Sequence, residues 1–194
     1  MLQVSKLSSP LFPDVSFDAK PGECICLYGE SGVGKTRLLR AIADLDDNQG
    51  DIRLNKHYRH ELPAHQWRNQ VTLVSAESAW WSKIVIDHFN GIEPDFTLLG
   101  LSDQIGQWFV ANLSTGERQR LSLLRALHHH PSVLLLDEIT ANLDPESTLK
   151  VESLLKQKMH DGLIVIWVTH DAQQRDRMAS RTYRIESQCV IEVD

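Results

Sequence analysis

The sequence is poor in cysteine, with three among 194 residues, and it contains no long hydrophobic run, internal repeat or low-complexity tract. No apolar stretch approaches the roughly 20 residues of a membrane-spanning helix. The first residues, MLQVSKLSSPLF, lack the basic start and long apolar stretch of a secretory signal. We therefore expect a cytoplasmic protein that forms a single domain over residues 1–194 and meets a membrane only through a partner.

An excess of positive charge is also missing. The 26 acidic residues outnumber the 20 lysines and arginines, which gives a net charge of −6. This balance argues against a broad binding surface for nucleic acid or for anionic lipid. We therefore expect no nucleic-acid partner.

Two of the cysteines are close in sequence. Cys24 and Cys26 alternate along a predicted strand, so their side chains share one face and do not easily form a disulfide. This lone C-x-C pair has two interpretations, metal binding or burial as small apolar side chains, and burial is favoured.

Strands and helices alternate along the sequence. The segment VLLLDE at 133–138 is a continuous apolar run, which is typical of a strand buried on both faces of a parallel sheet. The pattern predicts a doubly wound α/β fold. The predicted strands are 2–7, 14–18, 24–28, 50–54, 70–75, 133–138 and 163–170, and the predicted helices are about 35–44, 115–129 and 145–159, with a last helix and strand after residue 170.

Residues 78–112 differ in character, because aromatic side chains occur there in short segments broken by NGIEP and LGLSD. We expect small helices that form a lobe, inserted in the core over about residues 78–127. The aromatic side chains are Trp80, Trp81, Phe89, Phe96 and Trp108. The tryptophans among them form either the core of this lobe or a partly exposed groove for a membrane partner.

A glycine-rich loop, GESGVGKT, lies between an apolar strand and a predicted helix and matches G-x-x-x-x-G-K-[ST] in full. The glycines let backbone N–H groups surround a phosphate, and the positive end of the following helix adds to that field. Lys35 is placed to reach the β- and γ-phosphates, and the Thr36 hydroxyl to bind Mg²⁺. The loop predicts binding of a nucleoside triphosphate by Gly29, Glu30, Ser31, Gly32, Val33, Gly34, Lys35, Thr36 and Arg37.

Polar residues end the two later apolar strands. Ligands of open parallel sheets bind at the carboxyl ends of the strands, so Asp137 and Glu138 are expected to face the phosphates. Asp137 is the predicted Mg²⁺ partner, and Glu138 is the predicted general base for an attacking water. His170 ends the next strand at the same edge, which predicts a hydrogen bond to the γ-phosphate or to that water.

The stretch NLSTGERQRLSLLRAL begins with a capping box, in which Ser114 caps a helix and Glu117 reaches back to the cap N–H. A helix N-terminus is an anion-binding site. An ordinary capped helix explains Ser114 and Glu117 equally well. The run His128–His130 ends this helix, and it predicts no metal site.

Together these segments resemble the ATP-binding subunits of ABC transporters over nearly the whole chain. The matching segments follow that family's order, and the later ones are most similar to small bacterial subunits for iron or metal-ion export. The resemblance implies a P-loop NTPase fold of ABC type: a mainly parallel sheet flanked by helices, a small N-terminal antiparallel part and a short helical lobe. The segments are GESGVGKT, LSTGERQR at 113–120, VLLLDE at 133–138, ANLD at 141–144 and VTHD with His170.

The resemblance also implies a head-to-tail homodimer that forms on ATP binding. Each ATP would lie between the glycine loop of one copy and the loop at 113–120 of the other. Asp144 would contact the opposite copy, and the neighbour's ATP would be approached by Ser114, Thr115, Gly116 and Glu117. Hydrolysis of ATP with Mg²⁺ would power an integral-membrane permease, a separate chain, from the inner face of the cell membrane.

Two positions, Ala76 and Thr115, depart from the family pattern. Ala76 stands where the family carries a glutamine that touches Mg²⁺ and water, so either Glu77 substitutes for it or hydrolysis and coupling are weakened. Thr115 replaces a glycine, and a β-branched residue would be strained there if the position needs positive φ. Phe12 is the nearby candidate for the aromatic that stacks on adenine, with packing in the core as the alternative.

Two other functions stay open from the sequence. One is an ABC-type ATPase that acts on DNA or ribosomes, although such proteins usually carry two cassettes or long coiled-coil insertions. The other is a nucleotide-binding regulatory module with weak hydrolysis, an alternative that Ala76 and Thr115 keep open.

Overall fold

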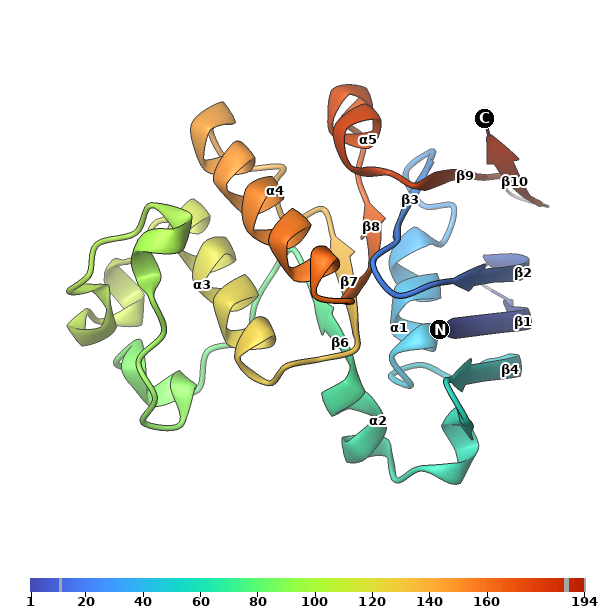
Figure 1. The fold of residues 1–194 in the computed structure, drawn as a ribbon, viewed down its shortest axis with the longest axis horizontal. Coiled ribbons are helices and arrows are strands. Elements are labelled where there is room, and N and C mark those ends of the chain that lie inside the picture. The colour runs from blue at the N-terminus through green and yellow to red at the C-terminus, as the bar shows by residue number, and fades with distance from the viewer. Residues whose placement is uncertain (11, 187–188, 194) are drawn as a thin grey trace.

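The computed structural model describes residues 1–10, 12–186 and 189–193. Its architecture is layered, with a smaller sheet, helix α1 (Lys35–Ile42) and a larger sheet in succession (Figure 1). Helices α3 (Thr115–His128) and α4 (Pro145–His160) lie on the far side of the larger sheet. The catalytic candidates therefore sit on a sheet that is covered by helices on both faces.

The larger sheet has six strands in the order β10-β9-β3-β8-β7-β6, and every pairing is parallel except that of β10 with β9. Strands β7 and β8 are buried along their whole length, as their continuous apolar sequence predicts. The predicted parallel core is thus confirmed. The strands are β3 (Cys24–Gly29), β6 (Val71–Val74), β7 (Val133–Asp137), β8 (Ile164–Val168), β9 (Arg181–Ile185) and β10 (Val190–Val193).

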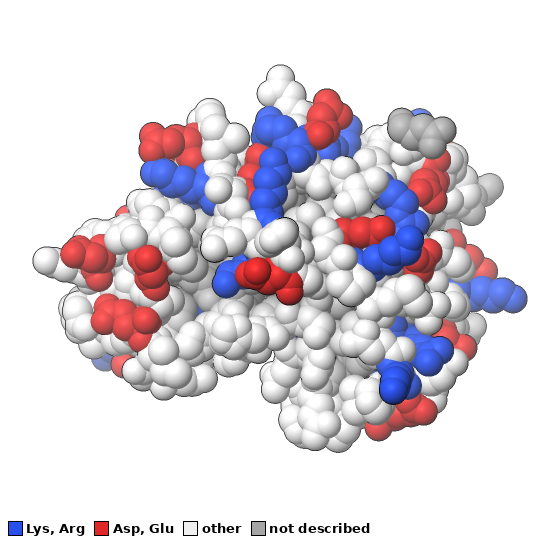
Figure 2. Space-filling model, viewed as in Figure 1, with Lys and Arg blue, Asp and Glu red and all other residues white. Residues whose placement is uncertain are grey.

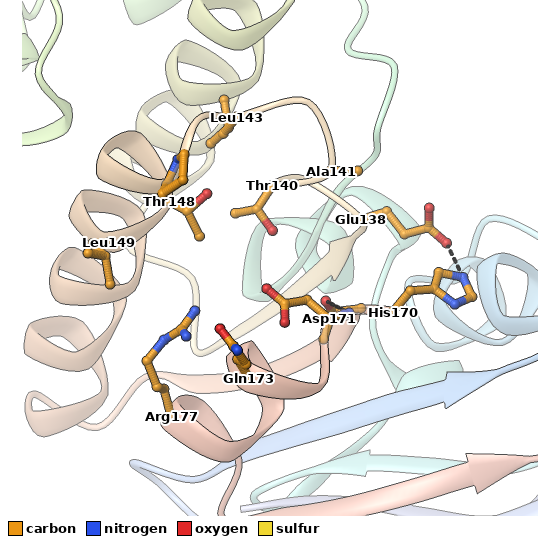
Figure 3. A pocket seen from close by; sticks show the side chains of 12 residues that line it. Glu138, Thr140, Ala141, Leu143, Thr148, Leu149, His170, Asp171, Gln173 and Arg177 are labelled. Atoms are coloured by element: carbon orange, nitrogen blue, oxygen red, sulfur yellow. Dashed lines mark hydrogen bonds and ion pairs between the residues drawn. The ribbon is translucent and has the colours of Figure 1, made fainter.

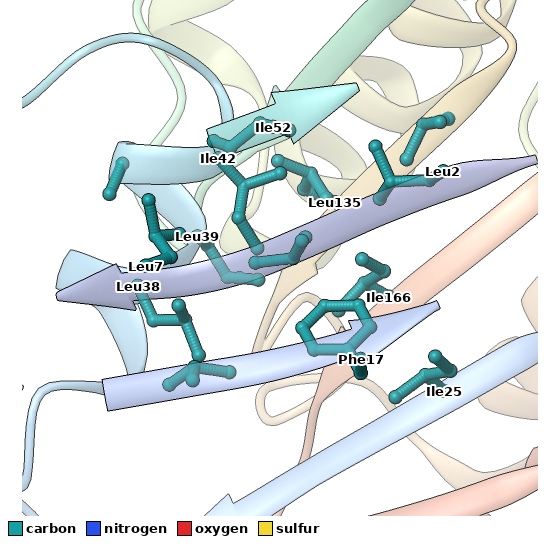
Figure 4. Packing of buried hydrophobic residues seen from close by; sticks show 14 of the residues in the cluster. Leu2, Leu7, Phe17, Ile25, Leu38, Leu39, Ile42, Ile52, Leu135 and Ile166 are labelled. Atoms are coloured by element: carbon teal, nitrogen blue, oxygen red, sulfur yellow. The ribbon is translucent and has the colours of Figure 1, made fainter. Parts of the chain in front are cut away.

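The smaller sheet is antiparallel and supports α1 from the other side. Its order is β2-β1-β4-β5, with β1 (Leu2–Ser9), β2 (Phe12–Ala19), β4 (Gln49–Leu54) and β5 (His57–Tyr58). One hydrophobic core fills the space between the two sheets and α1, where Leu2, Leu38 and Ile166 come from three different elements (Figure 4). This core fixes α1, and with it the loop that precedes α1, against the larger sheet.

A second core lies on the opposite face of the larger sheet. Because side chains alternate along a strand, Ile25 and Leu27 enter the first core while Cys24 and Cys26 enter the second. Both cysteines are completely buried, with their sulfur atoms 3.9 Å apart, so the packing interpretation is correct. Cys189, in contrast, is exposed near the start of β10.

Several short elements are missing from the sequence-based prediction. They include β5, the 3-10 helix Arg59–Glu61, α2 (Ala64–Gln70) and the second strand of the terminal β9–β10 hairpin. Only Trp67 of α2 is buried, so the helix lacks the repeated apolar positions that reveal an amphipathic helix. The helix α5 (Ala172–Met178) matches the predicted last helix.

The lobe of short helices is present, but its helices are 3-10 turns of three or four residues. They are Ile86–Phe89, Phe96–Leu99, Ile105–Gln107 and Val110–Asn112. Its aromatic side chains differ in exposure, and two of its tryptophans lie outside the core. Phe89 and Phe96 are buried in the second core, whereas Trp81 is 71% exposed and Trp108 is 40% exposed.

The charged side chains are mixed in sign over the face seen in Figure 2, where lysines and arginines lie beside acidic residues. Within the described part of the chain, no helix is both long enough and apolar enough to cross a membrane.

Candidate active site

The glycine loop connects β3 to α1 at the carboxyl edge of the larger sheet. At Gly29 the backbone passes so close to Ile185 that a Cβ would lie 2.3 Å from the Ile185 carbonyl oxygen. Gly34 has φ +101° and precedes α1 without a side-chain cap. The loop therefore leaves the first N–H groups of α1 to a ligand, in a conformation that only glycine adopts readily.

Lys35 lies within the turn of this loop. Its ammonium donates to the carbonyl oxygens of Gly29 and Glu30 at 3.0 and 2.8 Å. Burial lowers the pKa of Lys35, while the negative charges of Glu138 and Asp137 act in the opposite direction. The same charges show that Lys35 shares one electrostatic site with the acidic pair.

Thr36 and Asp137 join the loop to β7. The Thr36 hydroxyl donates to Oδ2 of Asp137 at 2.9 Å, across 101 residues of sequence. Burial raises the pKa of Asp137, and the Thr36 hydrogen bond opposes this rise. A hydroxyl and a carboxylate at this distance are oxygen donors of the kind that Mg²⁺ prefers, so the two residues predicted as its ligands fit the ion.

Glu138 and His170 are both predicted at this edge of the sheet, and the structure also brings them into contact. Their side chains meet at 3.1 Å, between Nε2 of His170 and Oε1 of Glu138, and both are partly exposed (Figure 3). Glu138 has φ +52°, in the left-handed region where a non-glycine residue costs about 1–3 kcal/mol. Its N–H donates to the carbonyl of Val168, which extends the ladder between β7 and β8 by one residue.

The remaining residues of the glycine loop have different surroundings. Glu30, Ser31 and Gly32 are exposed, as a loop open to a ligand requires. Arg37 points away toward the end of α1, where its guanidinium pairs with Asp46 at 3.0 Å. The structure thus gives Arg37 a protein partner outside the loop.

The ring of Phe12 is 6% exposed and belongs to the core between the two sheets, as the packing alternative predicts. It also borders a surface hollow of about 370 Å³ together with Arg37 and Leu45.

The capping box at the start of α3 is present as predicted. The Ser114 hydroxyl accepts from the N–H of Glu117 at 3.2 Å, and the Glu117 carboxylate accepts from the N–H of Ser114 at 2.8 Å. Thr115 is the first residue of α3 and is absent from the described non-glycine residues with positive φ. Its β-branched side chain therefore carries no left-handed strain. Gly116 lies against Leu143, which a Cβ would meet at 3.1 Å.

Asp144 caps α4 by accepting from the N–H of Ser147 at 2.9 Å, and this hydrogen bond lowers the pKa of Asp144. Between Glu138 and Asp144 the chain passes a cavity of about 490 Å³, which is lined there by Glu138, Thr140, Ala141 and Leu143 (Figure 3). The cavity brings Glu138 and His170 together with residues that the sequence did not indicate, namely Thr140, Thr148, Gln173 and Arg177. The sequence does not single out these four residues, because each lies in a helix or turn without a recognisable motif.

Comparisons with known proteins identify relatives of this chain. The ABC transporter family profile matches residues 12–141. A probable anion import ATP-binding protein of Haloferax volcanii is 33% identical over 87% of this chain and 69% of its own length. The methionine import ATP-binding protein MetN 1 of Acinetobacter baylyi is 31% identical over 82% of this chain, which spans only 51% of that relative.

A solved structure shares the fold. It is the dimeric, post-hydrolysis state of the ATP-binding cassette MJ0796 bound to ADP and Pi, with a TM-score of 0.83, 19% identity and coverage of 100% of this chain and 99% of that one. The chain belongs to the ABC transporter family, as one of its ATP-binding, ATP-hydrolysing subunits.

Proposed function

We propose that this chain hydrolyses ATP with Glu138 as the general base and His170 as the group that orients Glu138 and the γ-phosphate. The observation that carries the proposal is the convergence of two pairs, Thr36 with Asp137 and Glu138 with His170, at the same edge of the sheet. Lys35 lies in the same field and supplies the positive charge for the β- and γ-phosphates.

Thr36 and Asp137 are the proposed holders of Mg²⁺, because their oxygens are adjacent and Asp137 is buried. When bound, the ion would neutralise charge on the phosphate oxygens. Glu138 is more exposed than Asp137, so it stays available to accept a proton from water. The adjacent carboxylates therefore have separate proposed roles.

The proposed working unit is a head-to-tail homodimer. Helices α1 and α3 start at the two anion-binding loops but lie on opposite faces of the larger sheet (Figure 1). Two copies facing each other would bring the Ser114–Glu117 loop of one against the glycine loop of the other. The dimeric state of the MJ0796 cassette is in keeping with such an arrangement.

The proposed partner is an integral-membrane permease, and the proposed location is the inner face of the cell membrane. The relatives described above are named as import ATP-binding proteins, for an anion and for methionine. Neither name refers to metal-ion export. Trp81, which is 71% exposed beside a hollow of about 280 Å³, is the proposed contact of the helical lobe with the permease.

Steady-state hydrolysis of MgATP by the purified protein tests the role of Glu138. We expect Glu138→Gln to be at least about 100-fold slower than wild type while it still binds ATP, because removal of a general base affects the chemical step. The exposed Glu93→Gln is the matched control and is expected to keep the wild-type rate. Lys35→Ala is expected to lose affinity in an ATP titration.

Light scattering of the same samples tests the dimer. Glu138→Gln is expected to accumulate as a dimer with MgATP, whereas Lys35→Ala stays monomeric. A wild type that hydrolyses as slowly as Glu138→Gln and forms the same stable dimer would contradict the proposal and favour a regulatory module.

A further inference from the structure

A chain of buried hydrogen bonds runs from α4 through α5 to the loop that follows Glu138. Glu152 on α4 is 2% exposed and accepts two hydrogen bonds from Arg177, each of 2.7 Å. It also accepts from Nε2 of Gln174 at 3.1 Å. Oε1 of Gln174 in turn accepts from the Thr140 hydroxyl at 3.1 Å. Gln174 is completely buried, so its side-chain amide depends on these protein groups for its hydrogen bonds.

The donors and acceptors in this series of hydrogen bonds can be arranged in only one order. An ionised carboxylate only accepts hydrogen bonds, so Glu152 forces the NH₂ group of Gln174 to face it. The amide oxygen of Gln174 must then face Thr140, whose hydroxyl donates. The direction of the Thr140 hydroxyl is therefore determined by a charged pair on α4 and α5, and its position by a completely buried amide.

Thr140 is part of the turn that begins at Glu138. The N–H of Ala141 donates to the carbonyl of Glu138 at 3.1 Å, with Ile139 and Thr140 between them. Ile139 is buried in the second core, and Thr140 is held by Gln174. These two contacts hold the segment that begins at Glu138, which has φ +52°. A conformation of that kind persists only where its surroundings hold it.

We propose that Thr140, Gln174 and Glu152 are positioning residues that hold the Glu138 turn in the conformation needed for ATP hydrolysis. This inference rests on the proposed role of Glu138. None of the three residues needs to touch ATP. Arg177, at the outer end, keeps the buried charge of Glu152 paired.

Thr140→Val tests the inference, since valine has nearly the shape of threonine but lacks the hydroxyl donor. We expect kcat to fall at least about fivefold while the dissociation constant for MgATP changes less than about twofold, the pattern of an interaction that acts on the chemical step. Thr140→Ser restores the donor and is expected to restore kcat. Single-turnover hydrolysis extends the measurable range to slow variants.

Thr182→Val is the matched control, because Thr182 lies in β9, outside the Glu138 cavity. It is expected to keep the wild-type kcat, and thermal melts establish that each variant is folded. A fivefold loss in Thr140→Val that serine does not rescue would overturn the inference, as would an unchanged kcat.

The double variant Glu138→Gln/Thr140→Val separates this inference from the proposed function. If Thr140 acts through Glu138, the double variant loses no more activity than Glu138→Gln alone. A further loss of the same size as in the single Thr140 variant would mean that Thr140 acts elsewhere. Full activity in Glu138→Gln would instead contradict the proposed role of Glu138 as the base. The positioning role of Thr140 would then have no catalytic residue to act on.

Discussion

At the scale of single residues, Asp137 and Glu138 at the end of β7 each lower the stability of the fold, for different physical reasons. Asp137 is 7% exposed and its pKa is raised by burial, whereas the cost at Glu138 lies in its left-handed backbone. Both costs oppose folding, and both residues belong to the proposed hydrolytic site. Residues at functional sites often lower the stability of a protein in this way, because they are placed for activity.

Asp137→Asn is expected to stabilise the protein when no nucleotide is added. A carboxyl whose folded pKa is raised favours folding below its unfolded pKa and loses that contribution as pH rises through the folded pKa. At pH 7 the wild type therefore carries an ionised Asp137 that asparagine would remove. We expect Tm to rise by about 2 °C at pH 7, a size that corresponds to less than 1 kcal/mol.

The difference in Tm should shrink as the pH is lowered, because burial raises the pKa of Asp137 and the folded protein takes up this proton at a higher pH than the unfolded chain does. Thermal melts at a series of pH values measure it. MgATP binding by the same variant should weaken, because a carboxylate ligand is lost. A lower Tm at pH 7 would show that the Thr36 hydrogen bond outweighs the cost of burial.

At the scale of secondary-structure elements, the start of α3 has two explanations, a helix cap and an anion-binding loop. The capping box of Ser114 and Glu117 is complete, so the cap needs no ligand to account for it. Substitution can separate the two roles, because aspartate caps helices as well as serine but repels phosphate.

Ser114→Ala is expected to lower Tm by about 2–4 °C through loss of roughly 1 kcal/mol of capping. Ser114→Asp keeps an acceptor for the cap but loses the hydroxyl that donates to the Glu117 carboxylate at 2.8 Å, so its Tm should fall no further than that of Ser114→Ala. It should hydrolyse ATP at least about tenfold more slowly than Ser114→Ala, since its charge would face the neighbour's phosphates. Ser153→Ala, on the exposed face of α4, is the matched control and should leave both quantities unchanged. Normal hydrolysis by Ser114→Asp would favour the plain cap.

Elements differ in how far the sequence predicts them. Strands β7 and β8 are predictable because every residue is apolar up to the polar end, and the predicted Thr36, Asp137, Glu138 and His170 meet as expected. The 3-10 turns of the lobe are too short to show a period. The bond between Glu152 and Arg177 spans 25 residues and has no local signature, which is why the positioning chain needed the structure.

At the scale of the whole molecule, the proposed homodimer requires each chain to present two incomplete halves of an ATP site. The glycine loop rests on the core between the sheets, and the Ser114–Glu117 loop rests on the core of the opposite face. Damage to one half therefore leaves the other half of the same chain intact in the proposed homodimer.

Mixing Lys35→Ala with Ser114→Asp should restore part of the ATPase activity that each variant lacks alone. A mixed pair combines the intact glycine loop of one copy with the intact Ser114–Glu117 loop of the other, which gives one complete site. We expect the mixture to exceed the summed rates of the two separate variants while staying below half of the wild-type rate, because each mixed pair has one complete site of two. Mixtures that stay inactive would argue that the site is complete within one chain.

The exposure of Cys189 has a practical consequence for such mixtures. Cys24 and Cys26 are completely buried, so a thiol-reactive dye added to the folded protein should attach at Cys189 alone. Separate batches carrying a donor and an acceptor dye would then report assembly as energy transfer, with no cysteine engineered into the chain. The same accessible thiol would let two copies become covalently joined in air, so preparations need a reductant until the label is attached.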